Sequence, residues 1–117
     1  MIKNILVLLI VVAATFFTTG CGTVDITKTA KGFHPPTDPN EVEILMTKPD
    51  NRPYEELGAI NATGFQPSET AKMHNALRTK AAPLGANAVI ITGSGMVNGG
   101  GWGGVQQYVT GVAIKWK

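Results

Sequence analysis

The chain has 117 residues, a formal net charge of +2 and a charged fraction of only 15%. This length suits one domain with short attachments rather than two domains. A balance this near neutral argues against a nucleic-acid binder, which would carry a basic patch or stripe. The 14 glycines and 7 prolines indicate turns and tethers rather than a helical bundle.

The first segment, residues 1–20, has the layout of a secretory signal peptide. Lys3 is the only charged residue before Asp25, and an apolar run extends from Ile5 to Phe17. A positive end, a short apolar centre and small residues before a cut form the secretory pattern. The alternative is a permanent membrane anchor, but a spanning helix needs about 20 apolar residues and this run is shorter.

The only cysteine of the chain, Cys21, directly follows this segment. One cysteine cannot form an intramolecular disulfide, and a catalytic thiol would want a basic neighbour. The residues TTGC, which end at Cys21, resemble the lipobox of bacterial lipoproteins. That resemblance implies cleavage before Cys21, a diacylglycerol thioether on its sulfur and an acyl chain on its amine. Two or more acyl chains anchor a protein stably, so the predicted partner of Cys21 is the lipid bilayer.

Gly22 would be the second residue of the mature chain. In lipoproteins that are sorted between two membranes, an Asp at this position retains the protein in the inner membrane. The resemblance therefore implies the outer membrane, on its periplasmic side, or the cell membrane if the organism has only one.

Residues 21–40 are polar, rich in threonine and end among prolines. We expect a lipidated N-terminus and a flexible tether here, extended near Pro35 and Pro36. The folded unit is then predicted to span residues 41–117.

The first half of this unit predicts two strands. Val42, Ile44 and Met46 alternate with polar residues, which is typical of a half-buried strand. A second strand is predicted over YEELGAINATG, residues 54–64. Leu57 and Ile60 cannot share one face of a regular pleat, so we expect a bulge at Gly58.

A helix is predicted after the second strand, with Ser68 as its N-cap. Met73 and Leu77 recur at helical spacing and are the expected buried face. Pro83 removes a backbone donor, so the helix should end or kink near Ala81.

Two more strands complete the unit. Residues 87–92 (NAVIIT) are apolar without alternation, which indicates a strand covered on both faces, and residues 108–117 (YVTGVAIKWK) alternate. The order strand–strand–helix–strand–strand predicts an α+β fold, a small and mostly antiparallel sheet of about four strands with one helix packed on one face.

A glycine-rich segment, residues 93–104, lies between the last two strands. It lacks the lysine of a phosphate-binding loop and the third glycine of a dinucleotide fingerprint. Two interpretations stay open: a mobile hairpin loop, or a loop in which Trp102 contacts a partner protein or lipid headgroups.

Motifs of catalysis and metal binding are not found. The sequence contains no HExxH, CxxC or GxSxG. His34 has no second ligand nearby, His74 is expected on the polar side of the helix, and adjacent Glu55 and Glu56 face opposite ways on a strand. We therefore expect no enzyme, no metal and no cofactor.

Three segments, YEELGAI, ALRTKAAPLGANAVII and GVAIKW, resemble the small domain of YbjQ-like proteins and of RcsF-like outer-membrane lipoproteins, which report envelope stress. The resemblance covers about Val42 to Lys117. It implies fold and, from the ring-forming YbjQ-like relatives, a homo-oligomer. RcsF-like domains carry disulfides, which the single cysteine of this chain cannot supply.

These inferences predict a membrane-anchored lipoprotein with a non-enzymatic interaction or envelope-sensing domain. Its expected partner is an unidentified envelope protein, and no nucleic acid is expected. The alternative is a structural or accessory subunit that self-assembles at the membrane.

Overall fold

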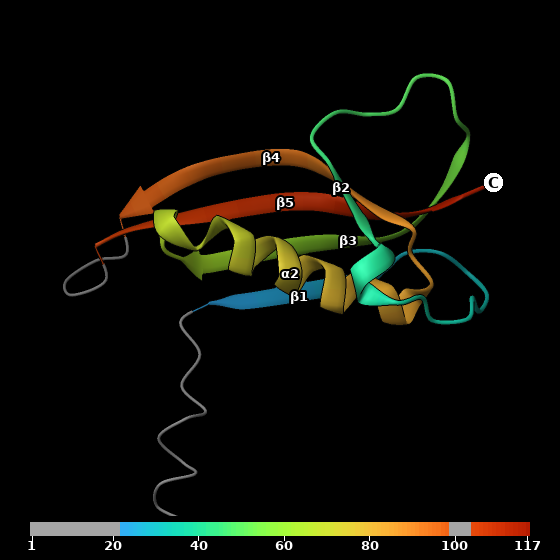
Figure 1. Cartoon of the computed structure of the whole chain (residues 1–117), viewed down its shortest axis with the longest axis horizontal. Coiled ribbons are helices and arrows are strands. Elements are labelled where there is room, and N and C mark those ends of the chain that lie inside the picture. The colour runs from blue at the N-terminus through green and yellow to red at the C-terminus, as the bar shows by residue number, and fades with distance from the viewer. Residues whose placement is uncertain (1–21, 99–103) are drawn as a thin grey trace, which may run out of the picture.

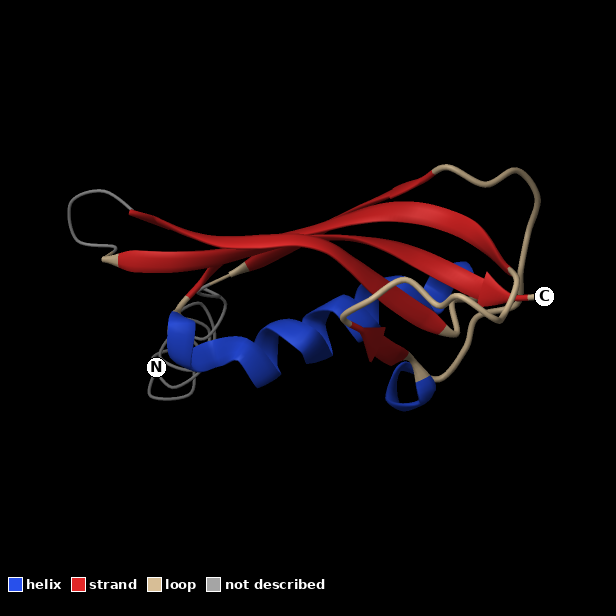
Figure 2. Ribbon diagram, turned by 90° about the horizontal axis from the view of Figure 1, so that it is seen from above, coloured by secondary structure: helices blue, strands red, loops and turns tan. Residues whose placement is uncertain are grey.

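A computed structural model describes residues 22–98 and 104–117 of the chain. In this part, five strands form one sheet in the order β1-β3-β5-β4-β2, and a helix, α2, lies across one face (Figures 1 and 2). The elements are β1 (Thr23–Lys28), β2 (Glu43–Leu45), β3 (Tyr54–Phe65), α2 (Thr70–Ala81), β4 (Ala88–Asn98) and β5 (Val105–Trp116). Single 3-10 turns, η1 (Pro39–Glu41), η2 (Pro67–Glu69) and η3 (Ala82–Leu84), link them.

The α+β class and the helix on one face of the sheet are confirmed. The sheet differs from prediction in two respects, because it has five strands rather than about four and is partly parallel. Strand β2 runs parallel to β4, with Ile44 opposite Val89, whereas the other three pairs are antiparallel.

The additional strand, β1, lies inside the segment predicted to be a tether. It pairs with β3 over its full length, from Thr23 opposite Thr63 to Lys28 opposite Gly58. Val24 is buried and Ile26 packs against the core, while Thr23, Asp25 and Thr27 are exposed. The tether prediction for residues 21–40 is therefore wrong over β1. The threonine-rich sequence is polar overall, but its apolar and polar residues alternate as in a half-buried strand.

The remainder of that segment is also held against the domain. The backbone N–H groups of Thr29 and Ala30 donate to the carbonyl of Leu57, and the N–H of Thr37 donates to the carbonyl of Ala82. The folded unit thus starts at β1 rather than at residue 41.

The predicted irregularity in β3 is confirmed. The register between β3 and β5 shifts between Glu56 and Gly58, which lets both Leu57 and Ile60 enter the core. A Cβ on Gly58 would come within 2.6 Å of the carbonyl oxygen of Thr27, so the close approach of β1 requires glycine here.

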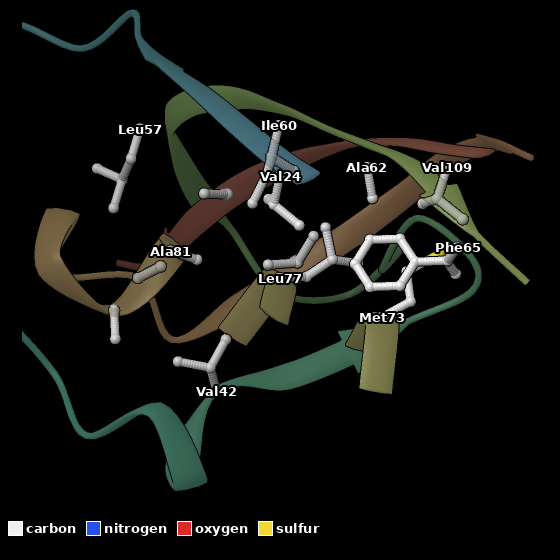
Figure 3. Packing of buried hydrophobic residues seen from close by; sticks show 14 residues of the cluster. Val24, Val42, Leu57, Ile60, Ala62, Phe65, Met73, Leu77, Ala81 and Val109 are labelled. Atoms are coloured by element: carbon white, nitrogen blue, oxygen red, sulfur yellow. The ribbon is translucent and has the colours of Figure 1, made fainter. Parts of the chain in front are cut away.

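The core lies between α2 and the sheet (Figure 3). Met73 and Leu77 are buried on the sheet side of the helix, as predicted, and pack among residues of β1, β3 and β5. The predicted N-cap is wrong, because Ser68 lies inside turn η2. Glu69 is the N-cap position of α2, and the turn that precedes the helix is capped by Gln66. The N–H of Gln66 donates to Glu69 Oε1 at 2.9 Å, and this bond, with help from Lys72, lowers the pKa of the Glu69 carboxyl.

The helix ends at Ala81, as expected, and Pro83 is accommodated in turn η3. Gly85 then reverses the chain with a φ of +87°, a left-handed conformation that glycine adopts at little cost. The chain passes directly from this turn into β4.

Strand β4 is longer than predicted, because it continues through Asn98. Residues 93–98, expected in a loop, form a hairpin arm with β5, with Gly95 opposite Tyr108. A Cβ on Gly95 would come within 2.8 Å of the Tyr108 ring, so glycine at this position makes room for the cross-strand aromatic side chain. The middle strand of the sheet is β5, and β4 lies between β5 and β2.

Candidate functional site

The two residues to which the sequence assigns a role lie outside the described residues. These are Cys21, the predicted lipidation site, and Trp102, the predicted contact. Near Cys21 the structure describes the chain from Gly22 onward. Near Trp102 it describes the chain up to Asn98 and again from Gly104. Among the described residues, no helix is both long and apolar enough to span a membrane.

A groove of about 470 Å³ runs between β2 and the C-terminal half of α2. Its walls are residues 40–45 on one side and Asn75 and Arg78 on the other. Arg78 bridges the two walls, because its Nε donates to the carbonyl of Val42 at 3.0 Å and its Nη1 donates to Asn75 Oδ1 at 2.7 Å. A fixed cation therefore stands in the groove opposite the exposed carboxylates of Glu41 and Glu43.

Strand β2, which forms one wall, is an edge of the sheet. Among residues 22–98 and 104–117 it pairs only with β4, and the N–H of Glu43 donates to the carbonyl of Asn87. Backbone groups alternate in direction along a strand, so those of Ile44 point away from β4 toward the open side. An unpaired strand edge beside a groove is the geometry that accepts an added strand from a partner.

A smaller hollow of about 150 Å³ lies on the face of the sheet away from α2. Its lining comprises Lys48, Tyr54, Glu56, Ile90, Thr92 and Val112. Beside it, the Tyr54 and Trp116 rings meet edge to face with centroids 6.4 Å apart, and the Arg52 guanidinium lies 4.2 Å above the Trp116 ring. These contacts partly cover the sheet, and the hollow is too small for most organic ligands.

The ionisable residues considered for catalysis do not come together. Glu55 faces His34 instead of His74, with 3.5 Å between Glu55 Oε2 and His34 Nε2, and this buried nitrogen makes no hydrogen bond within the described residues. His74 lies on α2, where partial burial and the nearby Arg78 lower its pKa. No group of three or more His, Cys, Asp or Glu side chains able to hold a metal occurs within residues 22–98 and 104–117.

The groove was not foreseen from the sequence. The alternation at Val42 and Ile44 indicated a strand, but not that it would be an edge or would run parallel to residues 88–90. The local signal was Arg78, because α2 contains no acidic residue that could pair with this cation.

Comparisons with known proteins add information on the fold alone. No protein-family model matches the chain, and no curated protein matches it. Among solved structures, the chain is similar to a Francisella virulence factor, FvfA, solved as a crystal structure in the orthorhombic form. The TM-score is 0.55 at 13% sequence identity, over 79% of this chain and 97% of that one. The class defined by fold and surface is thus a small α+β domain with a helix on a mixed sheet.

Proposed function

We propose that this protein is a lipoprotein anchored through acylated Cys21, on the periplasmic side of the outer membrane, and that its domain binds another envelope protein without catalysis. In an organism with one membrane the anchor lies in the cell membrane. Support for the anchor comes from the run TTGC and from the apolar leader before it.

The observation that carries the binding role is the open edge of β2 beside the groove. An extended segment of a partner can pair with the backbone of Ile44, while its side chains enter the groove beside Arg78. A carboxylate on that segment would find the Arg78 guanidinium, whose planar fork suits such a group. The short length of β2 limits the affinity of backbone pairing, as a reversible sensor requires.

The anchor is tested by replacing its cysteine. In bacteria that process lipoproteins, Cys21→Ala should accumulate as precursor, take up no labelled palmitate and leave the membrane fraction after its leader is removed. Thr27→Ala is the matched control, since residue 27 is exposed on β1 and outside the lipobox. Normal maturation and palmitate labelling of Cys21→Ala would contradict the anchor.

The binding surface is tested by photo-cross-linking in intact cells. A photoreactive amino acid at position 43, on the open edge of β2, should cross-link to a foreign envelope protein. The same group at position 25, exposed on the opposite sheet edge β1, should not. Cross-links from position 25 alone would place the binding surface elsewhere.

A second function is favoured by the two open edges of the sheet. Within the part of the chain that the structure describes, strands β1 and β2 each pair on one side only, so copies of the domain can associate edge to edge. In that case the protein is a structural or accessory subunit that self-assembles at the membrane. A ladder of self-cross-links from positions 25 and 43 together would support this function over the binding of a foreign protein.

A further inference from the structure

Exposed apolar side chains gather at the end of β4 and the start of β5, which together form a hairpin arm. Met96 is 59% exposed, Val97 48% and Val105 50%. Val97 and Val105 lie beyond Gln107, and Met96 lies directly opposite it. Gln107 itself is held by the segment before α2, since its Nε2 donates to the carbonyl of Gln66 at 2.8 Å. Figure 2 shows the two strands extending past the beginning of the helix.

These side chains point to both faces of the arm. Met96 lies opposite Gln107 and Asn98 opposite Val105, so Met96 and Val105 share one face. Val97, opposite Gln106, faces the other way because successive residues of a strand alternate. A flat partner docked on one face would leave the other apolar face in water, whereas entry into an apolar phase end-on covers both.

The same end of the domain carries the start of the chain that leads to Cys21. Thr23 pairs with Thr63 near the end of β3, and Phe65, two residues later, pairs with Gln107. Gly22 lies against the Phe65 ring, where a Cβ would come within 2.8 Å. In Figure 1 the start of β1 and the arrowhead of β4 lie at the same end of the sheet. Cys21 is bonded directly to Gly22, so an anchor at that residue would attach to this end of the domain.

The described end of the arm carries no charge, as contact with an apolar phase requires. The chain has no charged residue between Lys80 and Lys115, so no ion is desolvated. The helix starts at this end with Glu69 and Lys72, and these pair with each other at 3.3 Å.

We propose that the described strand ends of the hairpin arm, with Met96, Val97 and Val105, contact the headgroup region of the lipid bilayer beside the anchor and bury these side chains there. This inference rests on the proposed anchoring through Cys21. The acyl chains and the arm then form two contacts with one membrane, which fixes the orientation of the domain. The groove between β2 and α2, at the C-terminal half of the helix, faces the aqueous compartment and stays open to a partner.

The test places a reporter on the arm of the complete lipidated protein. Val97→Cys is labelled with an environment-sensitive fluorophore and reconstituted into vesicles of phosphatidylethanolamine and phosphatidylglycerol, some carrying a lipid-bound quencher. The matched control is Lys117→Cys, an exposed residue at the far end of β5. We expect the emission at position 97 to shift to the blue and to fall about twofold with the quencher, and the emission at position 117 to stay unchanged.

Other outcomes overturn the proposal in distinguishable ways. If both variants sediment with vesicles but the two labels are equally water-exposed, the arm does not insert while the anchor stands. If protection at position 97 disappears on dilution of the protein in the membrane, a second copy covers the arm instead of lipid. If the parent chain itself takes up the thiol-reactive label, Cys21 is not acylated, and both the anchor and the insertion fail.

Discussion

The contribution of a single residue to the stability of this domain depends on how completely its neighbours bury it. Leu77 has no exposed surface and faces the sheet between Met73 and Ala81, each on the same stripe of α2. The stripe follows from helical spacing alone, so the sequence predicted it. The depth of burial sets its energetic weight, and this depends on the strands across the core.

We expect Leu77→Asp to lower the free energy of unfolding by several kcal/mol, because an unpaired carboxylate would be buried. Ala71→Asp, on the exposed side of the same helix, is the control and should change stability by less than about 0.5 kcal/mol. Urea unfolding measures both. Equal stability of the two variants would mean that this face of α2 is not in the core.

His74 should make stability depend on pH. Partial burial and the charge of Arg78 lower its pKa below the ordinary value of 6.5, so the unfolded chain binds the proton more readily. Stability from this residue is complete above pH 6.5 and declines as the pH falls below it. Denaturant unfolding at pH values about one unit above and below 6.5 measures this slope. The slope should diminish in His74→Gln, and an unchanged slope would assign the effect to another group.

At the scale of elements, the turn between α2 and β4 depends on one glycine. Gly85 has a φ of +87°, and a Cβ there would meet the Cβ of His34 at 2.6 Å and the carbonyl oxygen of Pro35 at 2.9 Å. The turn therefore also seats the loop that precedes β2. Pro83 and Gly85 revealed the end of the helix, but nothing local indicated that a loop 50 residues earlier packs on it.

We expect Gly85→Ala to be more destabilising than Gly32→Ala. Both residues have positive φ, near +90°, so both variants incur about 1–2 kcal/mol of left-handed strain. Nothing lies within 4 Å of a Cβ on Gly32, whereas at Gly85 the His34 loop must also move, which adds about 1–3 kcal/mol. Thermal unfolding compares them, and equal losses would show that the loop yields without cost.

At the scale of the whole molecule, β1 decides where the domain begins. Its six paired residues cover the edge of β3, and Val24 and Ile26 close one side of the core. A domain that starts two residues after Cys21 would be held against the membrane instead of being lifted from it. Under the proposed anchoring through Cys21, this arrangement would bring the hairpin arm to the lipid surface.

A chain that begins at Thr29 should be less stable than one that begins at Gly22 by several kcal/mol. Removal of β1 exposes the core and a long edge of β3, and burial of one valine alone contributes about 1.5–3 kcal/mol. Urea unfolding of the two chains measures the difference. Identical midpoints would restore the interpretation of residues 23–28 as a tether.

Local pattern alone determined the helix, its buried stripe at Met73 and Leu77, the bulge at Gly58 and the alternation of β5, because each depends on the spacing of near neighbours. It also singled out Cys21, whose acylation remains a prediction. Tertiary structure decided what lies beside what: Val24 next to Ala62, β2 parallel to β4, and glycines 93 and 95 in a strand under the side chains of β5. Such pairings join residues far apart in the chain. Their stability arises from backbone hydrogen bonds and burial that exist only once both strands are in place.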